Sequence, residues 1–184
     1  HAGPRVHLID RAESDAVHPD ERTTPINAAG ARMLAALGAW DRLETPPAPV
    51  TRIAVAEGPA PTGLAARRRP DSDLSWQSGD APMGYVVANA ALQAALRETL
   101  AATNVIERRG CGVTGWSAGD TILSLELADA AGQEQTMEAA LVVACDGARS
   151  MMAELAGLGR REERQRQTAI VTTVRAERSH EGPA

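Results

Sequence analysis

LVVACDGARS, residues 141–150, is the most informative stretch of this chain. Its apolar first half predicts a buried strand, Leu141 to Cys145, and Asp146-Gly147 then places a carboxylate and a closely approachable backbone at the strand's carboxyl end. Open α/β sheets bind their ligands at that edge. Two interpretations stay open on these residues alone: a ligand-binding turn, or a strand-to-helix turn in which Asp146 caps the following helix.

The composition is that of a globular protein with a core of ordinary size. Hydrophobic residues make up 43% of the 184 residues, charged residues 23%, and the net charge is -5. This balance excludes the basic excess of a nucleic-acid-binding protein and the low hydrophobicity of a disordered chain. No apolar run reaches the roughly 18 residues of a membrane span. The cysteines and histidines lack metal-ligand spacing, so we expect no metal site and a reduced, cytoplasmic protein.

The apolar pattern predicts alternating strands and helices, which only a mixed α/β fold accommodates. A short buried strand is expected from Arg5 to Asp10, where it ends in an acid, and residues 13–25 are expected to form a polar loop. Helical spacing follows Asn27, a good cap, and stops at Gly38; a second helix opens at Asn89. Further strands are expected at 50–57, 83–87, 105–108, 113–116, 121–127, 135–137 and 168–174, with those between 105 and 137 forming a β-meander.

One motif match is rejected. Gly110 to Gly115 fits G-x-G-x-x-G, the dinucleotide fingerprint, whose third glycine opens a helix that holds the pyrophosphate. Here an alternating, strand-like pattern follows instead of a helix. We therefore interpret the match as a chance occurrence in the meander.

Two side chains outside the opening stretch could contact a dinucleotide. An acid at the end of a Rossmann strand, such as Asp10, accepts the ribose hydroxyls. Arg22 could clamp a pyrophosphate, or it could pair on the surface with Asp20 or Glu21. Because no nucleophilic triad or pair of catalytic carboxylates is recognisable, we expect a cofactor to supply the chemistry.

Taken in order, these segments resemble the FAD-dependent aromatic hydroxylases of the para-hydroxybenzoate hydroxylase type, in the branch that serves ubiquinone biosynthesis. The similarity covers nearly the whole chain. It rests on VHLID at 6–10, DERTTPIN at 20–27, the apolar pattern of 34–40, MGYVVAN at 83–89, DGARS at 146–150, QTAIV at 167–171 and ERSH at 177–180.

The resemblance implies a Rossmann-like FAD-binding domain interleaved with a β-sheet substrate domain, here truncated at both ends. Asp10 would hold the adenosine ribose of FAD and Arg22 would reach the FAD phosphates. Asn89 would contact the ribityl-phosphate region of the flavin. Asp146 and Gly147 would form a motif shared between the FAD pyrophosphate and NAD(P)H.

The resemblance also implies domain boundaries. Residues 1–57 would belong to the FAD-binding domain, 58–82 to an insert of the substrate domain, 83–159 to the FAD-binding domain again, and 160–184 to the start of the substrate domain. Three departures stand against it: a glycine fingerprint before Asp10 and a later Gly-Asp motif are missing, and Ala153 occupies a position where relatives carry Arg. The first two lead us to expect that this piece alone holds FAD poorly.

The function implied is an FAD-dependent monooxygenase that uses NAD(P)H and oxygen to hydroxylate a polyprenyl phenol on the way to ubiquinone. The expected partners are this small aromatic substrate and, through its lipid character, the inner face of the membrane or a biosynthetic complex, but no nucleic acid. Two alternatives stay open: another FAD-dependent oxidoreductase of the same superfamily, or a non-catalytic module that does not retain flavin.

Overall fold

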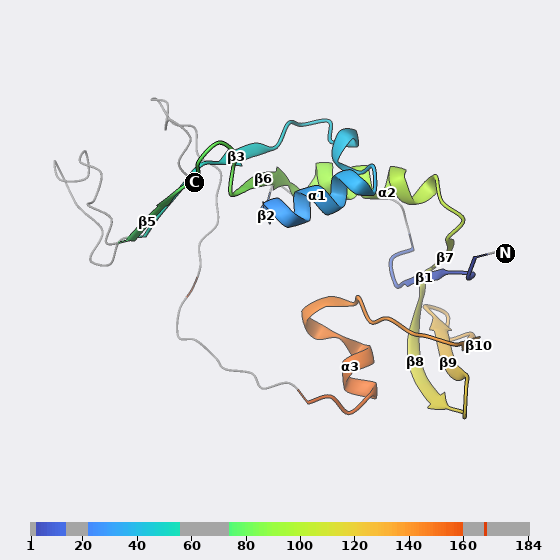
Figure 1. The fold of residues 1–184 in the computed structure, drawn as a ribbon. Coiled ribbons are helices and arrows are strands. Elements are labelled where there is room, and N and C mark those ends of the chain that lie inside the picture. Colours follow the sequence, from blue (N-terminus) through green and yellow to red (C-terminus); the bar gives the residue numbers. More distant parts are fainter. Residues whose placement is uncertain (1–2, 14–21, 56–73, 160–167, 169–184) are drawn as a thin grey trace. The chain divides into compact units, whose positions relative to one another are not determined.

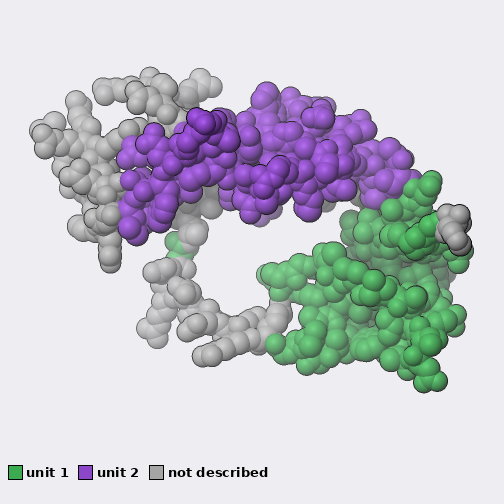
Figure 2. Space-filling view, in the orientation of Figure 1, with its two compact units in different colours: residues 1–16, 104–169 green, residues 17–103, 170–184 purple. Residues whose placement is uncertain are grey.

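The computed structural model describes residues 3–13, 22–55, 74–159 and Thr168. The chain divides into two compact units, coloured separately in Figure 2. Unit 1 comprises residues 1–16 and 104–169, and unit 2 comprises residues 17–103 and 170–184. Apart from Thr168, the expected strand at 168–174 lies outside the described residues, as does most of the expected insert at 58–82.

Unit 1 contains a parallel strand pair. β1 (His7–Asp10) runs beside β7 (Ile106–Arg109), in a register that joins Asp10 to Arg109. Parallel strands need a long connection, and here residues 11–105 provide it. Both strands therefore end at the same edge, where Asp10 was expected to bind a ribose. The expectation that this strand is buried is wrong, since Leu8 is 41% exposed.

The meander of unit 1 is a three-stranded antiparallel sheet in the order β10-β9-β8 (Figure 1). Its strands are β8 (Cys111–Ala118), β9 (Leu123–Asp129) and β10 (Glu134–Ala139). In the central strand, Leu125 and Leu127 are each 2% exposed, because alternate residues of a strand point to the same face. These leucines form the core of the meander. The described part of unit 1 ends with η3 (Gly147–Arg149) and α3 (Met151–Leu155).

Unit 2 is built on a second antiparallel sheet, in the order β2-β6-β3. Its strands are β2 (Thr23–Asn27), β3 (Ala48–Val50) and β6 (Gly84–Ala88). Two of these strands continue directly into a helix. β2 leads into α1 (Ala28–Ala36), and the central strand β6 leads into α2 (Asn89–Ala101). A separate hairpin-like pair consists of β4 (Arg52–Val55) and β5 (Leu74–Gln77).

The boundaries of α1 follow from its sequence, as expected. The Gly30 amide donates to the Asn27 side chain at 2.7 Å, which is the cap predicted for this helix. Gly38 has a φ of 75°, a left-handed conformation that ends helices and favours glycine. The chain then forms η1 (Trp40–Arg42). The rings of Trp40 and Tyr85 pack edge to face, with their centroids 5.0 Å apart.

The predicted polar loop at 13–25 is wrong at its end, because β2 begins at Thr23. Pro25 pairs with Val86 in the sheet. Proline is tolerated there since β2 is an edge strand, so its missing N–H leaves no partner unsatisfied. Within the described part of residues 58–82, the chain forms one strand, β5.

The predicted buried strand Leu141 to Cys145 is also wrong. No strand of the described part of the chain pairs with it, and Leu141 and Val143 are 76% and 70% exposed. A β-strand is formed only when its backbone groups hydrogen-bond to a neighbouring strand. Within the described residues, Leu141 to Cys145 have no such neighbour. The predicted meander is confirmed for β8, β9 and β10. β7, which was expected to belong to the meander, pairs with β1 instead.

Candidate functional site

Arg22 and Asn89, two of the expected cofactor contacts, lie directly opposite each other in unit 2. The β2–β6 register pairs Thr23 with Ala88. The backbone N–H of Asn89 extends this ladder by donating to the backbone carbonyl of Arg22 at 3.0 Å. Arg22 is exposed and Asn89 is half-buried. The sheet thus brings together a guanidinium and an amide that are far apart in the sequence.

Thr24 joins this pair, although sequence reasoning missed it. It stands opposite Val87, so that it is a diagonal neighbour of Asn89 on the same face of the sheet. Its hydroxyl donates to the Asn89 side-chain oxygen at 2.5 Å. Strand alternation from Arg22 would have indicated Thr24, had residues 13–25 not been interpreted as a loop.

The start of α2 adds a third element to this cluster of Arg22, Thr24 and Asn89, which we call the β2–β6 cluster. The residue that caps α2 is Ala88, whose side chain accepts no hydrogen bond from the first turn. The first amides of a helix carry partial positive charge and bind anions. Together with Arg22, this arrangement suits a phosphate-bearing ligand.

Asp10 lies exposed at the carboxyl end of β1, as expected. Its Oδ1 accepts a hydrogen bond from the Ala12 amide at 3.0 Å, which fixes the turn that follows the strand. Asp10 belongs to unit 1 and the β2–β6 cluster to unit 2. Within unit 1, it shares the edge with Arg109, whose side chain is ion-paired with Glu107.

Asp146 accepts a hydrogen bond from the first turn of α3, although Ser150, and not Asp146, is the residue that caps this helix. Asp146 Oδ2 accepts from the Met152 amide at 3.2 Å, at the start of α3. Ser150 Oγ accepts from the Ala153 amide at 3.0 Å in the same turn. A contact between Asp146 and a cofactor stays a prediction.

The charge of Asp146 should persist to lower pH than that of an ordinary aspartate. A hydrogen bond from Ser150 and, next, the Met152 amide lower the pKa of this carboxyl from its ordinary 3.8. Because the folded-state pKa is the lower one, the stabilising contribution is present above the unfolded-state pKa and is lost as the pH falls through the folded-state pKa. We expect Ser150→Ala to raise the pKa of Asp146, as measured by carbon NMR titration; an unchanged midpoint would contradict the role of Ser150.

Gly147 has a φ of 80°, in the left-handed region. A Cβ atom at this position would meet nothing within 4 Å, so a substitution meets conformational strain alone. We expect Gly147→Ala to lower the free energy of unfolding by about 1 kcal/mol. Gly147→Asn should cost less, because asparagine tolerates this conformation better. Urea unfolding measures both, and an alanine variant as stable as the parent would contradict the expectation.

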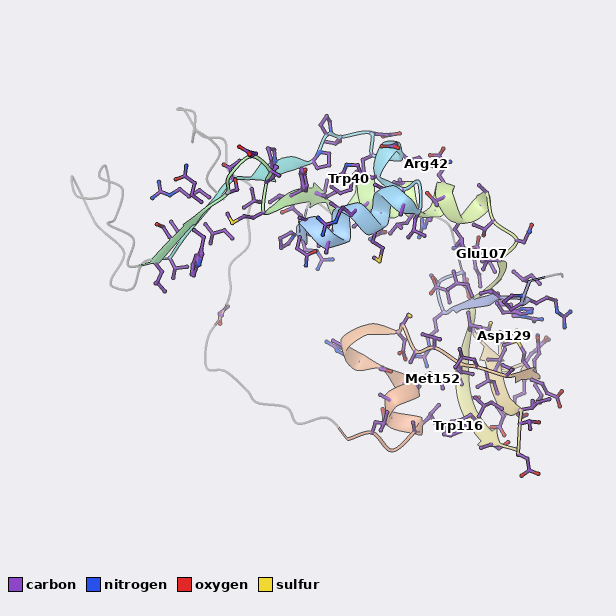
Figure 3. All side chains as sticks on the ribbon, in the orientation of Figure 1. Trp40, Arg42, Glu107, Trp116, Asp129 and Met152 are labelled. Carbon is purple, nitrogen blue, oxygen red and sulfur yellow. The ribbon has the colours of Figure 1, made fainter. Side chains whose placement is uncertain are left out.

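A small apolar pocket of about 240 Å³ lies in unit 1 between the meander and the residues after it. Figure 3 labels two of its lining residues, Trp116 on β8 and Met152 on α3, and the Trp116 indole donates to the Leu155 carbonyl at 3.2 Å. Ala153 also lines this pocket. The departure from the expected arginine therefore places a methyl group in an apolar environment.

The rejected glycine motif at 110–115 lies mostly within β8, and no helix follows it, so its rejection is confirmed. Within the described ranges, no three His, Cys, Asp or Glu side chains gather in a way that could hold a metal ion. Each helix in the described part of the chain is too short or too polar to cross a membrane.

The sequence is similar to a known protein family and to a ubiquinone hydroxylase. The family described as FAD binding domain matches residues 1–181. The ubiquinone hydroxylase UbiL of Rhodospirillum rubrum is 35% identical over 189 residues, which cover 99% of this chain and 41% of that protein. The chain thus spans about two fifths of this relative's length.

Solved structures show the same fold. The p-nitrophenol 4-monooxygenase PnpA from Pseudomonas putida is similar over 84% of this chain and 38% of its own, with 20% identity and a TM-score of 0.64. The anhydrotetracycline hydroxylase OxyS from Streptomyces rimosus is similar over 83% of this chain and 29% of its own, with 17% identity and a TM-score of 0.60. The mixed α/β fold and the resemblance to FAD-dependent hydroxylases are confirmed.

Proposed function

We propose, because this chain belongs to the FAD binding domain family, that it holds FAD within a monooxygenase that hydroxylates an aromatic ring. The observation that carries the proposal is the apposition of Arg22, which immediately precedes β2, and Asn89, which immediately follows β6. The sequence predicts an FAD contact for each of these residues, although they lie far apart in the chain. Their meeting on one face of a sheet supports a common ligand.

The side chains of the β2–β6 cluster fit the phosphate and ribityl segment of FAD. The Arg22 guanidinium offers two parallel N–H donors, the geometry that phosphate oxygens accept. The Asn89 amide offers further donors, and the first turn of α2 adds its partial positive charge. We propose that Arg22 binds a phosphate and that Asn89 binds the adjoining ribityl-phosphate region.

Three residues of unit 1 are also proposed to contact or to support the binding of FAD. The exposed Asp10 carboxylate would accept the hydroxyls of the adenosine ribose at the end of β1. Gly147 would let the backbone approach the pyrophosphate closely, since it has no side chain in an exposed turn. Asp146 would act by holding that turn against α3. We further propose that β1 and β7 are neighbouring strands of a Rossmann-like sheet, interleaved with a substrate domain.

FAD, when bound, would supply the redox chemistry that couples NAD(P)H and oxygen to the hydroxylation of an aromatic ring. The residues of this chain bind and orient the cofactor. No acid–base side chain is required of them, which agrees with the absence of a catalytic pair in the sequence.

The proposed substrate is a phenol that carries a polyprenyl chain, an intermediate of ubiquinone biosynthesis. Support comes from the similarity to the ubiquinone hydroxylase of R. rubrum. A lipid of this kind would bring the protein to the inner face of the membrane or into a biosynthetic complex. Another FAD-dependent oxidoreductase activity is the alternative, and a module that retains no flavin is a further one, favoured by Ala153.

A spectrum and two assays separate these functions. We expect the full-length protein to show visible flavin absorbance, to oxidise NAD(P)H faster when a polyprenyl phenol is added, and to release a product with one additional oxygen atom. Flavin without phenol-stimulated oxidation would favour another oxidoreductase. A colourless protein that takes up no added FAD would contradict both enzyme functions.

A further inference from the structure

We infer that Thr24 is a positioning residue, which fixes the orientation of the Asn89 side-chain amide by holding its oxygen against β2. This inference rests on the proposed function, because it assumes that Asn89 contacts the cofactor. An asparagine side chain has an acceptor oxygen at one end and a donor nitrogen at the other. Only the donor end suits a phosphate or ribityl oxygen acceptor. The orientation of the amide therefore decides whether Asn89 can bind the cofactor.

The structure shows what sets this orientation. The Thr24 hydroxyl donates to Asn89 Oδ1 at 2.5 Å, so that the oxygen end of the amide is held against β2. The Asn89 backbone is held in turn by the Arg22 carbonyl at 3.0 Å. With backbone and oxygen both fixed, the amide nitrogen has a defined direction. Preorganisation of this kind lowers the entropy lost on binding.

The surroundings favour a persistent contact. Thr24 and Asn89 are both half-buried, and partial shielding from water strengthens a hydrogen bond. Both side chains are neutral, so salt does not screen the interaction. Threonine is also restricted about χ1, which keeps its hydroxyl in place in a strand. The neighbouring Thr23 points to the other face of β2, because successive strand residues alternate.

The test uses three variants of the full-length protein and its dissociation constant for FAD, measured by flavin fluorescence. Thr24→Val removes the hydroxyl and keeps the branched shape, and we expect FAD binding to weaken roughly three- to tenfold. Thr24→Ser keeps the hydroxyl and should bind FAD like the parent. Thr23→Val makes the same exchange on the opposite face and should also leave binding unchanged.

A double-mutant cycle with Asn89→Ala shows whether Thr24 acts through Asn89. In the Asn89→Ala background we expect Thr24→Val to have no further effect on FAD binding. An equal loss in both backgrounds would overturn the inference, because it would indicate a general weakening of β2. So would a Thr24→Val protein that binds FAD normally while Asn89→Ala does not, and in that case the proposed function would stand.

The proposed function fails in a different way. If Arg22→Ala and Asn89→Ala both leave FAD binding unchanged, the β2–β6 cluster does not hold the cofactor. If the parent protein binds no FAD, the proposed function is wrong and the role of Thr24 is overturned with it.

Discussion

Replacing Arg22 by alanine should weaken FAD binding roughly ten- to a hundredfold, which corresponds to one charge-assisted hydrogen-bonding contact with a phosphate. Arg22 is exposed, and its backbone carbonyl accepts a hydrogen bond from Asn89 at the start of α2, where Ala88 provides no side-chain cap. Removal of the guanidinium takes away the only full positive charge that the β2–β6 cluster contributes. Binding titrations with FAD, followed by flavin fluorescence, measure the loss.

Two further variants show whether the planar fork of Arg22 matters or only its charge. Arg22→Lys keeps the charge but cannot donate two parallel hydrogen bonds, so we expect an intermediate affinity. Arg32→Ala removes the same charge from the exposed surface of α1 and serves as the control. An Arg22→Ala protein that binds FAD no more weakly than the Arg32→Ala protein would contradict the assignment of Arg22.

Gly84→Ala should destabilise unit 2 by about 1–3 kcal/mol, the usual cost of overfilling a packed position. Gly84 pairs with Asn27 in the β2–β6 register and is buried. A Cβ atom added there would lie 2.5 Å from the Ile26 carbonyl oxygen and 3.2 Å from Asn27 Cα. Both contacts are with backbone, which cannot move without separating β2 from β6.

The same ladder that Gly84 closes also places Arg22 opposite Asn89, so the variant should weaken FAD binding as well as folding. Urea unfolding and FAD titration of one protein preparation measure both effects. Gly79→Ala is the matched control, since a Cβ atom at Gly79 would meet nothing within 4 Å. Equal stability of the two variants would show that β2 and β6 are not packed as closely as described.

The helices of unit 2 could be predicted because their signals are local. Asn27 caps α1 and Gly38 ends it, and both effects act within a few residues. The meander was predictable for the same reason, since its strands alternate and are joined by short turns. Asn89 could be predicted as a cofactor contact only through the family resemblance, whereas the chemistry of the guanidinium already suggested Arg22.

The pairing of those two residues could not be predicted, because it depends on the register of strands separated by more than half of unit 2. Thr24 was missed with it, since its role appears only once β2 lies beside β6. Leu141 to Cys145 failed in the opposite direction. Its apolar residues have strong strand propensity, but a strand also needs partners, and the described chain supplies none. Local pattern therefore located the elements, and tertiary pairing built the site.

A crystal structure of the full-length protein with FAD tests the central claim most directly. The proposed function predicts that the Arg22 guanidinium and the Asn89 side-chain nitrogen lie within hydrogen-bonding distance of the phosphate and ribityl segment of FAD. The Thr24 hydroxyl should still donate to the Asn89 oxygen in that complex. FAD bound with both Arg22 and Asn89 turned away from it would contradict the account.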